Sequence, residues 1–210
     1  MSDGTSQNEG GVGASPTSTF LREWVRSPLK TAAILPSSRW LARAMAFCVR
    51  PGESVVEIGA GTGAITDALI ERIGDDGSLL SLDINPTLAK SLKLRHPNLD
   101  VHVGDARNLI WILRGRGQVG RIHSVVSSLG LLAMPDSAVE DVLRASFGVV
   151  TPGGKFIQFT YGPSAPVSAE MLDNLGLRCD RVSWVMRNIP PASVYVIRRK
   201  PGTPNNRSIA

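Results

Sequence analysis

The feature that most constrains this chain is the stretch Val55–Ala64, which reads VVEIGAGTGA. Its apolar residues lead to Glu57, and three alternating glycines follow at Gly59, Gly61 and Gly63. The pattern predicts a buried strand that turns sharply into a helix, because glycine lacks the Cβ atom that would keep a ligand away from the backbone. We therefore expect a site for a nucleotide-like cofactor. The loose dinucleotide pattern G-x-G-x-x-G/A also fits these residues.

Composition narrows the class of protein. The chain has 210 residues, of which 42% are hydrophobic, and this suits one domain with a single core. The net charge of +5 arises between Phe20 and Arg50, where six basic residues face one acid, so a broad basic groove for nucleic acid is not indicated. Cys48 and Cys179 lie far apart, which predicts neither a disulfide nor a cysteine metal site and suits a reducing compartment.

From residue 54 onward, short β-branched runs alternate with helix-like segments, which predicts a parallel α/β sheet with crossover helices. The expected strands are 54–58, 78–83, 99–103, 122–128 and 154–160. The expected helices are 63–73, 86–95, 106–114 and 136–147. A short helix near 168–175 then precedes two strand-like runs, Cys179–Arg187 and Ser193–Arg199, joined by Asn188–Pro191. These two runs predict an antiparallel hairpin at the end of the sheet.

Local signals mark several boundaries within this pattern. Asn85 before Pro86 predicts a capped helix start, and Thr151–Gly154 predicts a sharp turn into the fifth strand. We expect a further helix over 38–49, capped by Ser37 or Ser38. The expected organisation is a disordered polar tail over 1–18, amphipathic membrane-docking and lid helices over 19–50, a catalytic domain over 51–200 and a disordered tail over 201–210.

Acids recur where the first three expected strands end, at Glu57, Asp83 and Asp105. The carboxyl ends of parallel strands share one edge of a sheet, and nucleotide folds bind their ligand at that edge. Asp83 lies about 20 residues beyond the glycines, at the distance where a carboxylate accepts both ribose hydroxyls. Asp105, followed by Ala106, is suited to the exocyclic amine of adenine.

Together these residues resemble the class I S-adenosylmethionine-dependent methyltransferases. The resemblance implies a Rossmann-like, mostly parallel seven-stranded sheet with an antiparallel carboxy-terminal hairpin, and S-adenosylmethionine as the cofactor. Contacts with that cofactor are expected from Ser38, Glu57, Gly59, Gly61, Gly63, Asp83, Ile84, Asp105 and Ala106. A nicotinamide oxidoreductase is the rival interpretation, although neither Tyr161 nor Tyr195 has a lysine four residues on. The three histidines show no ligand spacing, so no metal is expected.

The amino-terminal part of the chain predicts an amphipathic helix over 19–27, which ends before Pro28. One side of this helix is apolar and aromatic, and the other is basic, as in helices that lie in an anionic membrane interface. An ordinary lid packed on the core is the alternative. The residues expected to dock on a membrane are Phe20, Leu21, Arg22, Trp24, Val25, Arg26 and Lys30.

Three runs, Phe20–Arg39, Gln158–Pro163 and Asn188–Tyr195, resemble the bacterial soluble-type phospholipid N-methyltransferases. The resemblance implies stepwise methylation of phosphatidylethanolamine towards phosphatidylcholine and docking through an amino-terminal amphipathic helix. Close relatives act on ornithine lipids. Family members commonly have proline after Ser-x-Leu in the acceptor segment, where this chain has Gly130, so ornithine lipid is an alternative substrate.

The residues expected to contact the methyl acceptor lie at the ends of the later strands and in the segments that follow them. We expect Tyr161 and Ser127 to act in catalysis, because an aromatic face attracts a methylated cation and both residues end strands. Substrate contacts are expected from Arg39, Ser127, Leu129, Tyr161 and Arg187, with the two arginines on the lipid phosphate. No aromatic residue follows Ser127–Leu132 to stack on an extruded base, which disfavours nucleic acid as a partner.

These observations predict a cytoplasmic enzyme that associates peripherally with the inner leaflet of the membrane, where its partners are an anionic surface and an aminolipid. The first nineteen residues lack the apolar core of a secretory signal, and no apolar run is long enough to span a bilayer. An rRNA adenine N-methyltransferase and a non-catalytic lipid-surface module are the alternative functions. The sequence predicts no oligomeric state.

Overall fold

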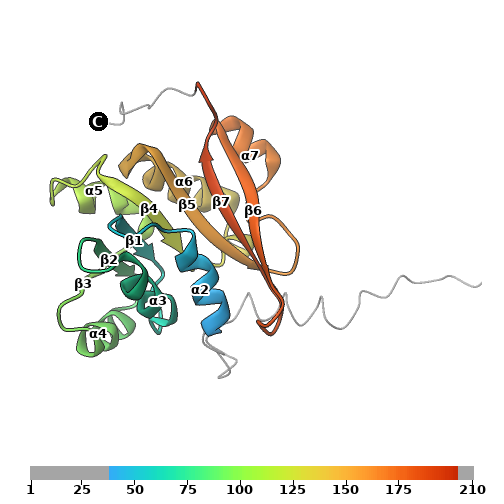
Figure 1. Ribbon diagram of the computed structural model, residues 1–210. Coiled ribbons are helices and arrows are strands. Elements are labelled where there is room, and N and C mark those ends of the chain that lie inside the picture. Colours follow the sequence, from blue (N-terminus) through green and yellow to red (C-terminus); the bar gives the residue numbers. More distant parts are fainter. Residues whose placement is uncertain (1–37, 203–210) are drawn as a thin grey trace, which may run out of the picture. The chain divides into compact units, whose positions relative to one another are not determined.

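The computed structural model describes residues 38–202, which form a seven-stranded sheet in the order β3-β2-β1-β4-β5-β7-β6 (Figure 1). The strands are β1 (Ser54–Ile58), β2 (Ser78–Asp83), β3 (Asp100–Val103), β4 (Ile122–Ser127), β5 (Val150–Tyr161), β6 (Leu177–Val185) and β7 (Ala192–Arg199). The first five strands are parallel, and β7 runs antiparallel to both β5 and β6. The predicted α/β architecture with its terminal hairpin is therefore confirmed.

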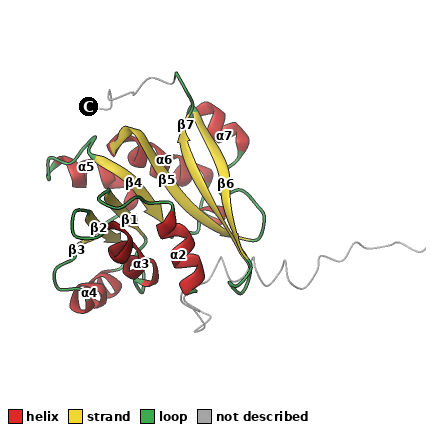
Figure 2. Cartoon of the chain, viewed as in Figure 1, coloured by secondary structure: helices red, strands yellow, loops and turns green. Residues whose placement is uncertain are grey.

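Helices cover both faces of this sheet (Figure 2). The α-helices are α2 (Arg39–Phe47), α3 (Ala64–Ile73), α4 (Pro86–Arg95), α5 (Leu109–Arg114), α6 (Asp136–Val149) and α7 (Ala169–Asn174), with 3-10 turns η1 (Ala106–Asn108) and η2 (Leu131–Ala133). Buried side chains of α2, α3 and α4 pack on one face, and those of α5, α6 and α7 pack on the other. Two apolar layers thus hold the central strands between them.

Helix starts agree with the capping signals. Asn85 accepts hydrogen bonds from the backbone amides of Thr87 and Leu88, and Pro86 occupies the first turn of α4 as predicted. The hydroxyl of Ser38 accepts from the amide of Leu41 at 3.3 Å, so Ser38 caps α2. The amphipathic helix expected over 19–27 and the tail expected over 1–18 lie outside the described residues.

Three predicted boundaries are wrong. Thr151–Gly154 belongs to β5 rather than to a turn before it, because Val150 already pairs with Ile122 and the register then shifts to Lys155 opposite Ser124. The helix expected over 106–114 is broken, because Asp105 caps the separate turn η1 before α5 begins. The first strand of the hairpin, expected over Cys179–Arg187, is β6 and spans Leu177–Val185, and Val185 pairs with Ala192. Of the tail expected over 201–210, only Pro201 and Gly202 are described, and they form a turn.

A buried ion pair fixes the amino ends of the central strands. Lys155 of β5 lies 2.9 Å from Glu53, which also accepts a hydrogen bond from Ser124 of β4. Burial alone raises the pKa of Glu53, but these two hydrogen bonds and the charge of Lys155 outweigh it and lower the pKa below its ordinary value. The pair explains the shifted register at the start of β5, since Lys155 must lie opposite Ser124.

The strand order reverses between β1 and β4, where the connection switches from one face of the sheet to the other. Such a switch leaves a crevice at the carboxyl ends of the strands, because neighbouring loops leave in opposite directions. Within residues 38–202, no helix is both long and apolar enough to cross a membrane.

Candidate active site

The glycine turn lies at this crevice, between β1 and α3. All three of its glycines have positive φ, at 73° for Gly59, 53° for Gly61 and 78° for Gly63. The amides of Gly59 and Ala60 donate to the Leu82 carbonyl, which ties the turn to the end of β2. Helix α3 starts after Gly63 with no side-chain cap, so its first amides are available to a ligand.

The three glycines meet different surroundings. A Cβ atom on Gly63 would lie 2.0 Å from a guanidinium nitrogen of Arg95, and one on Gly59 would lie 2.9 Å from a methyl carbon of Leu129. At Gly61 the nearest described atom would be the Gly59 carbonyl oxygen, at 3.8 Å. A side chain at Gly59 or Gly63 would thus displace the end of a neighbouring side chain, whereas Gly61 leaves open space above the backbone.

Glu57 lies beneath the turn and is completely buried. Its Oε2 accepts hydrogen bonds from the hydroxyls of Thr66 in α3 and Ser81 in β2, both at 2.7 Å, while Oε1 has no hydrogen-bond partner among the described residues. Burial raises the pKa of Glu57 to about 7, with smaller contributions from the charges of Asp67 and Asp83. This placement makes Glu57 a support for the turn, and its expected contact with the cofactor stays a prediction.

Asp83 ends β2 beside the turn. Its two carboxylate oxygens accept hydrogen bonds from the amides of Gly61, at 2.7 Å, and Asn85, at 2.8 Å. An ionised carboxylate has about four acceptor positions, so each oxygen retains capacity for one more donor. The predicted binding of two ribose hydroxyls is therefore compatible with the bonds that Asp83 already makes.

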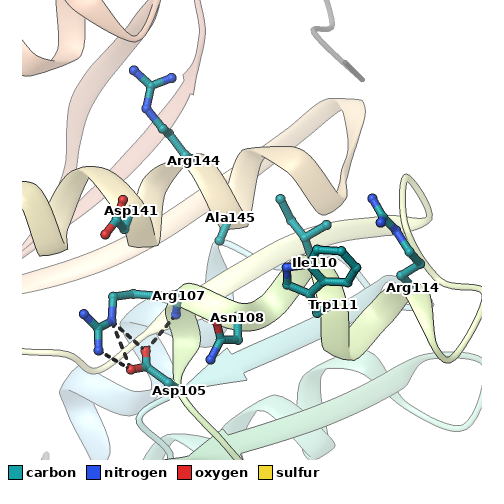
Figure 3. A pocket seen from close by; sticks show the side chains of 9 residues that line it. All are labelled: Asp105, Arg107, Asn108, Ile110, Trp111, Arg114, Asp141, Arg144 and Ala145. Carbon is teal, nitrogen blue, oxygen red and sulfur yellow. Dashed lines mark hydrogen bonds and ion pairs between the residues drawn. The ribbon is translucent and has the colours of Figure 1, made fainter. Parts of the chain in front are cut away.

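The residues expected to lie around adenine differ in their exposure to solvent. Ile84 is 69% exposed and directly follows Asp83, whereas Ala106 is buried in the core. The carboxylate of Asp105 is engaged by the side chain and the backbone amide of Arg107, and these contacts lower the pKa of Asp105 (Figure 3). Binding of adenine by Asp105 thus requires it to share its carboxylate with Arg107 or to release that arginine.

A pocket of about 430 Å³ opens beyond Asp105, between α5 and α6. Figure 3 shows Arg107 and Asp105 at one end of it and Trp111 near Arg114 at the other. The Arg114 guanidinium lies 4.6 Å from the centre of the Trp111 ring. Sequence reasoning missed this pocket because it depends on the packing of two helices.

The acceptor segment after β4 is more closed than expected. Ser127 is completely buried, and its hydroxyl accepts from the amide of Leu129. This placement does not favour the predicted contact between Ser127 and an acceptor.

Gln158, which received no site role from the sequence, lies opposite Ser127 in β5 and donates to the carbonyl of Leu129 at 2.9 Å. Its Oε1 is buried without a partner among the described residues. Only the pairing of β4 with β5 brings Gln158 to this segment.

Tyr161 is the last residue of β5 and packs edge-on against Phe159, with ring centres 5.4 Å apart. Both rings lie on the face of the sheet that α2 covers. Burial raises the pKa of Tyr161 to about 12, so its phenol is neutral at physiological pH. A neutral phenol offers an aromatic face and a hydroxyl, and it does not act as a base.

The start of α2 contacts the turn between β6 and β7. Asn188 is buried, and its Oδ1 accepts from the amide of Ser38 at 3.2 Å. The predicted substrate residues Arg39 and Arg187 both meet Trp40, with guanidinium carbons 5.2 Å and 4.7 Å from the ring centre. The structure thus brings together two arginines that lie 148 positions apart in sequence, and Asn188 is a further positioning residue that no local pattern indicated.

The groups at the crevice suit the cofactor expected from the sequence. Open space over Gly61 and the uncapped amides of α3 suit the methionine portion of S-adenosylmethionine. Spare acceptor positions on Asp83 suit the ribose, and the exposed Ile84 side chain suits adenine. Among residues 38–202, no group of three His, Cys, Asp or Glu side chains is arranged to hold a metal ion.

Comparisons with known proteins agree with this fit. Residues 55–154 match the family model described as a methyltransferase domain. The ornithine lipid N-methyltransferase of Singulisphaera acidiphila is 34% identical over 188 residues, which are 85% of this chain and 94% of that protein. A ubiquinone/menaquinone biosynthesis C-methyltransferase of Legionella pneumophila is 28% identical over 57% of this chain, and the match spans only 46% of that relative.

Solved structures support the fold. The fibrillarin of Aeropyrum pernix, whose crystal structure contains natively bound S-adenosylmethionine, superposes with a TM-score of 0.55 over 74% of this chain and 76% of its own. The two sequences are 18% identical, so this likeness concerns the fold alone. The family match establishes S-adenosylmethionine as the cofactor, and its binding at the glycine turn stays a prediction.

Proposed function

Because this chain belongs to the class I S-adenosylmethionine-dependent methyltransferases, we propose that it methylates the amino group of a membrane lipid. The observation that carries the proposal is the similarity to an ornithine lipid N-methyltransferase over 94% of that relative. It favours ornithine lipid over phosphatidylethanolamine, which the sequence alone favoured. Both lipids present an amine near an anionic group, a carboxylate in the first and a phosphate in the second.

On the cofactor side, the residues of the chain orient the donor. The cofactor, when bound, supplies an electrophilic methyl group on a sulfonium centre. Asp83 and the amides around Gly61 hold the ribose and methionine portions, and this binding fixes the direction in which the methyl group points. Glu57 keeps the turn in shape through Thr66 and Ser81.

On the acceptor side, we assign Tyr161 to the amine and Arg39 with Arg187 to the anionic group of the lipid. The Tyr161 ring can hold an amine through each methylation, because attraction between a cation and an aromatic face persists when N–H donors are lost. Because burial raises the pKa of Tyr161 to about 12, its phenol stays neutral, and the ammonium releases its proton to solvent before the amine attacks the methyl group. The two arginines offer planar donors that suit either a carboxylate or a phosphate.

The test is methyl transfer from labelled S-adenosylmethionine by the full-length chain to vesicles that contain either ornithine lipid or phosphatidylethanolamine. Label in a lipid amine, with ornithine lipid labelled faster, supports the proposal. The Asp83→Ala variant is the control for transfer that does not depend on the site. Absence of label in both lipids, together with label in rRNA or in a quinone precursor, would overturn it.

A further inference from the structure

The end of β6 and the turn that follows it expose large apolar side chains. Trp184 is 40% exposed, Met186 67% and Ile189 79%. The indole nitrogen of Trp184 donates to the sulfur of Met186, so these two side chains lie together. We call the set Trp184, Met186, Arg187 and Ile189 the hairpin rim. Exposed apolar groups concentrated in one short stretch mark an interaction surface rather than ordinary surface variation.

The stretch 181–191, which contains the hairpin rim, is basic, while Asp180 directly before it pairs with Arg178. Between residues 181 and 191 the chain has Arg181 and Arg187 and no acid. The Arg181 guanidinium lies 5.8 Å from the centre of the Trp184 ring, and Arg187 lies against Trp40. The neighbouring first turn of α2 also has no acid and contributes Arg39. The surface thus combines tryptophan, aliphatic side chains and arginine, the mixture that suits the headgroup region of an anionic bilayer.

The position of the hairpin rim relates it to the crevice. Ala192, the first residue of β7, pairs with Tyr161, the last residue of β5, so the turn lies at the carboxyl edge of the parallel strands. Figure 1 shows this turn near the start of α2, in agreement with the hydrogen bond between Asn188 and Ser38. A bilayer against the hairpin rim would therefore present its headgroups to Tyr161, Arg39 and Arg187.

We propose that the hairpin rim is a membrane-docking surface that inserts among the headgroups of an anionic bilayer, separate from the docking residues expected in 20–30. This inference rests on the proposed function, because a lipid amine reaches a buried methyl donor only if the crevice opens towards the membrane. Charge complementarity selects the partner, since positive and apolar groups together bind anionic lipid more strongly than either group alone. Arg187 then contacts lipid phosphate or carboxylate at the edge of the site.

The test uses the full-length chain with Trp184→Ser, Met186→Ser and Ile189→Ser combined. The matched control combines Phe47→Ser, Leu94→Ser and Val119→Ser, which remove exposed apolar side chains away from the rim and from the described site. Binding is measured by sedimentation with vesicles of phosphatidylethanolamine and phosphatidylglycerol, with and without deletion of residues 1–30. Affinity for S-adenosylmethionine and the unfolding temperature report whether each variant is folded.

We expect the rim variant to bind these vesicles on the order of tenfold more weakly than the control variant, with unchanged affinity for S-adenosylmethionine. Methylation of lipid in vesicles should fall in parallel, while methylation of a monomeric short-chain aminolipid should stay at the control rate. Vesicle binding equal to that of the control variant, in either the full-length or the shortened chain, would overturn the inference. Failure of the proposed function has a different signature, namely no methylation of either form of aminolipid by the unmodified chain.

Discussion

The two sides of the crevice are built in different ways. The cofactor side, at the ends of β1 and β2, presents backbone amides and the carboxylate of Asp83. The hydrogen bonds that Asp83 accepts from Gly61, and Glu57 from Thr66 and Ser81, join residues 9 to 24 positions apart. The acceptor side, formed by Tyr161, α2 and the β6–β7 turn, depends on side chains, and its bond between Ser38 and Asn188 joins residues 150 positions apart. The cofactor side, which depends on backbone amides and one carboxylate, suits a cofactor that relatives share. The acceptor side, which depends on side chains, suits an acceptor that differs among relatives.

The largest expected effect separates the two sides. Asp83→Ala removes the acceptor for the Gly61 and Asn85 amides and the proposed ribose contact. We expect affinity for S-adenosylmethionine to fall on the order of a thousandfold, because each hydrogen bond to a buried charge is substantial. Calorimetric titration measures this loss, and vesicle binding should be unchanged. Asp76→Ala, at an exposed acid away from the crevice, is the control. Near-normal affinity in Asp83→Ala would mean that the cofactor side is held elsewhere.

The second prediction concerns the pH dependence of the free energy of unfolding, which arises from Glu57 on the cofactor side. The pKa of Glu57 is raised by burial from 4.5 to about 7, so the folded protein binds a proton there that the unfolded chain has lost between these values. The free energy of unfolding should therefore decrease by about 3 kcal/mol as pH rises from 4.5 to 7, and change no further from this source at higher pH.

Glu57→Gln should remove that dependence, since the glutamine does not titrate and its oxygen can still accept from Thr66 and Ser81. Urea unfolding at pH 5 and at pH 7.5 measures the difference. The stability of the variant relative to the original chain should improve at the higher pH. Parallel stability curves for the two proteins would contradict the assignment. On the acceptor side, the pKa of Tyr161 is about 12, so Tyr161 adds no such dependence in this range.

The smallest expected effect tests the acceptor side. Tyr161→Ala removes the aromatic face and should lower kcat/KM for aminolipid about tenfold, consistent with the energy of a partly desolvated contact between a cation and a ring. Tyr161→Phe keeps the face and should stay within about threefold of the original value. Both variants should bind S-adenosylmethionine normally. If phenylalanine loses as much activity as alanine, the hydroxyl rather than the ring carries the role.

The contrast between the two sides also explains what the sequence could predict. Periodicity and capping signals placed β1, β2 and α4 at their observed bounds, because these elements are specified by neighbouring residues such as Asn85 and Pro86. The glycine turn and Asp83 were found for the same reason. Gln158 and Asn188 begin two of the runs that carry the family resemblance, but they received no site role, because their contacts depend on pairing between distant strands and with α2. The burial of Ser127 likewise follows from packing, which a short motif does not encode.

The irregular, charged edge of strand β6 affects how copies of this protein would associate. It is the last strand of the sheet, and such an edge can recruit a strand from another molecule. Here the register shifts between Arg181 and Ser183, and Arg178, Asp180 and Arg181 are exposed, so the edge is both bent and charged. Proteins gathered on a bilayer encounter their own copies at high surface density. This irregular edge would keep crowded copies from joining their sheets, and it would preserve solubility where aggregation is most readily nucleated.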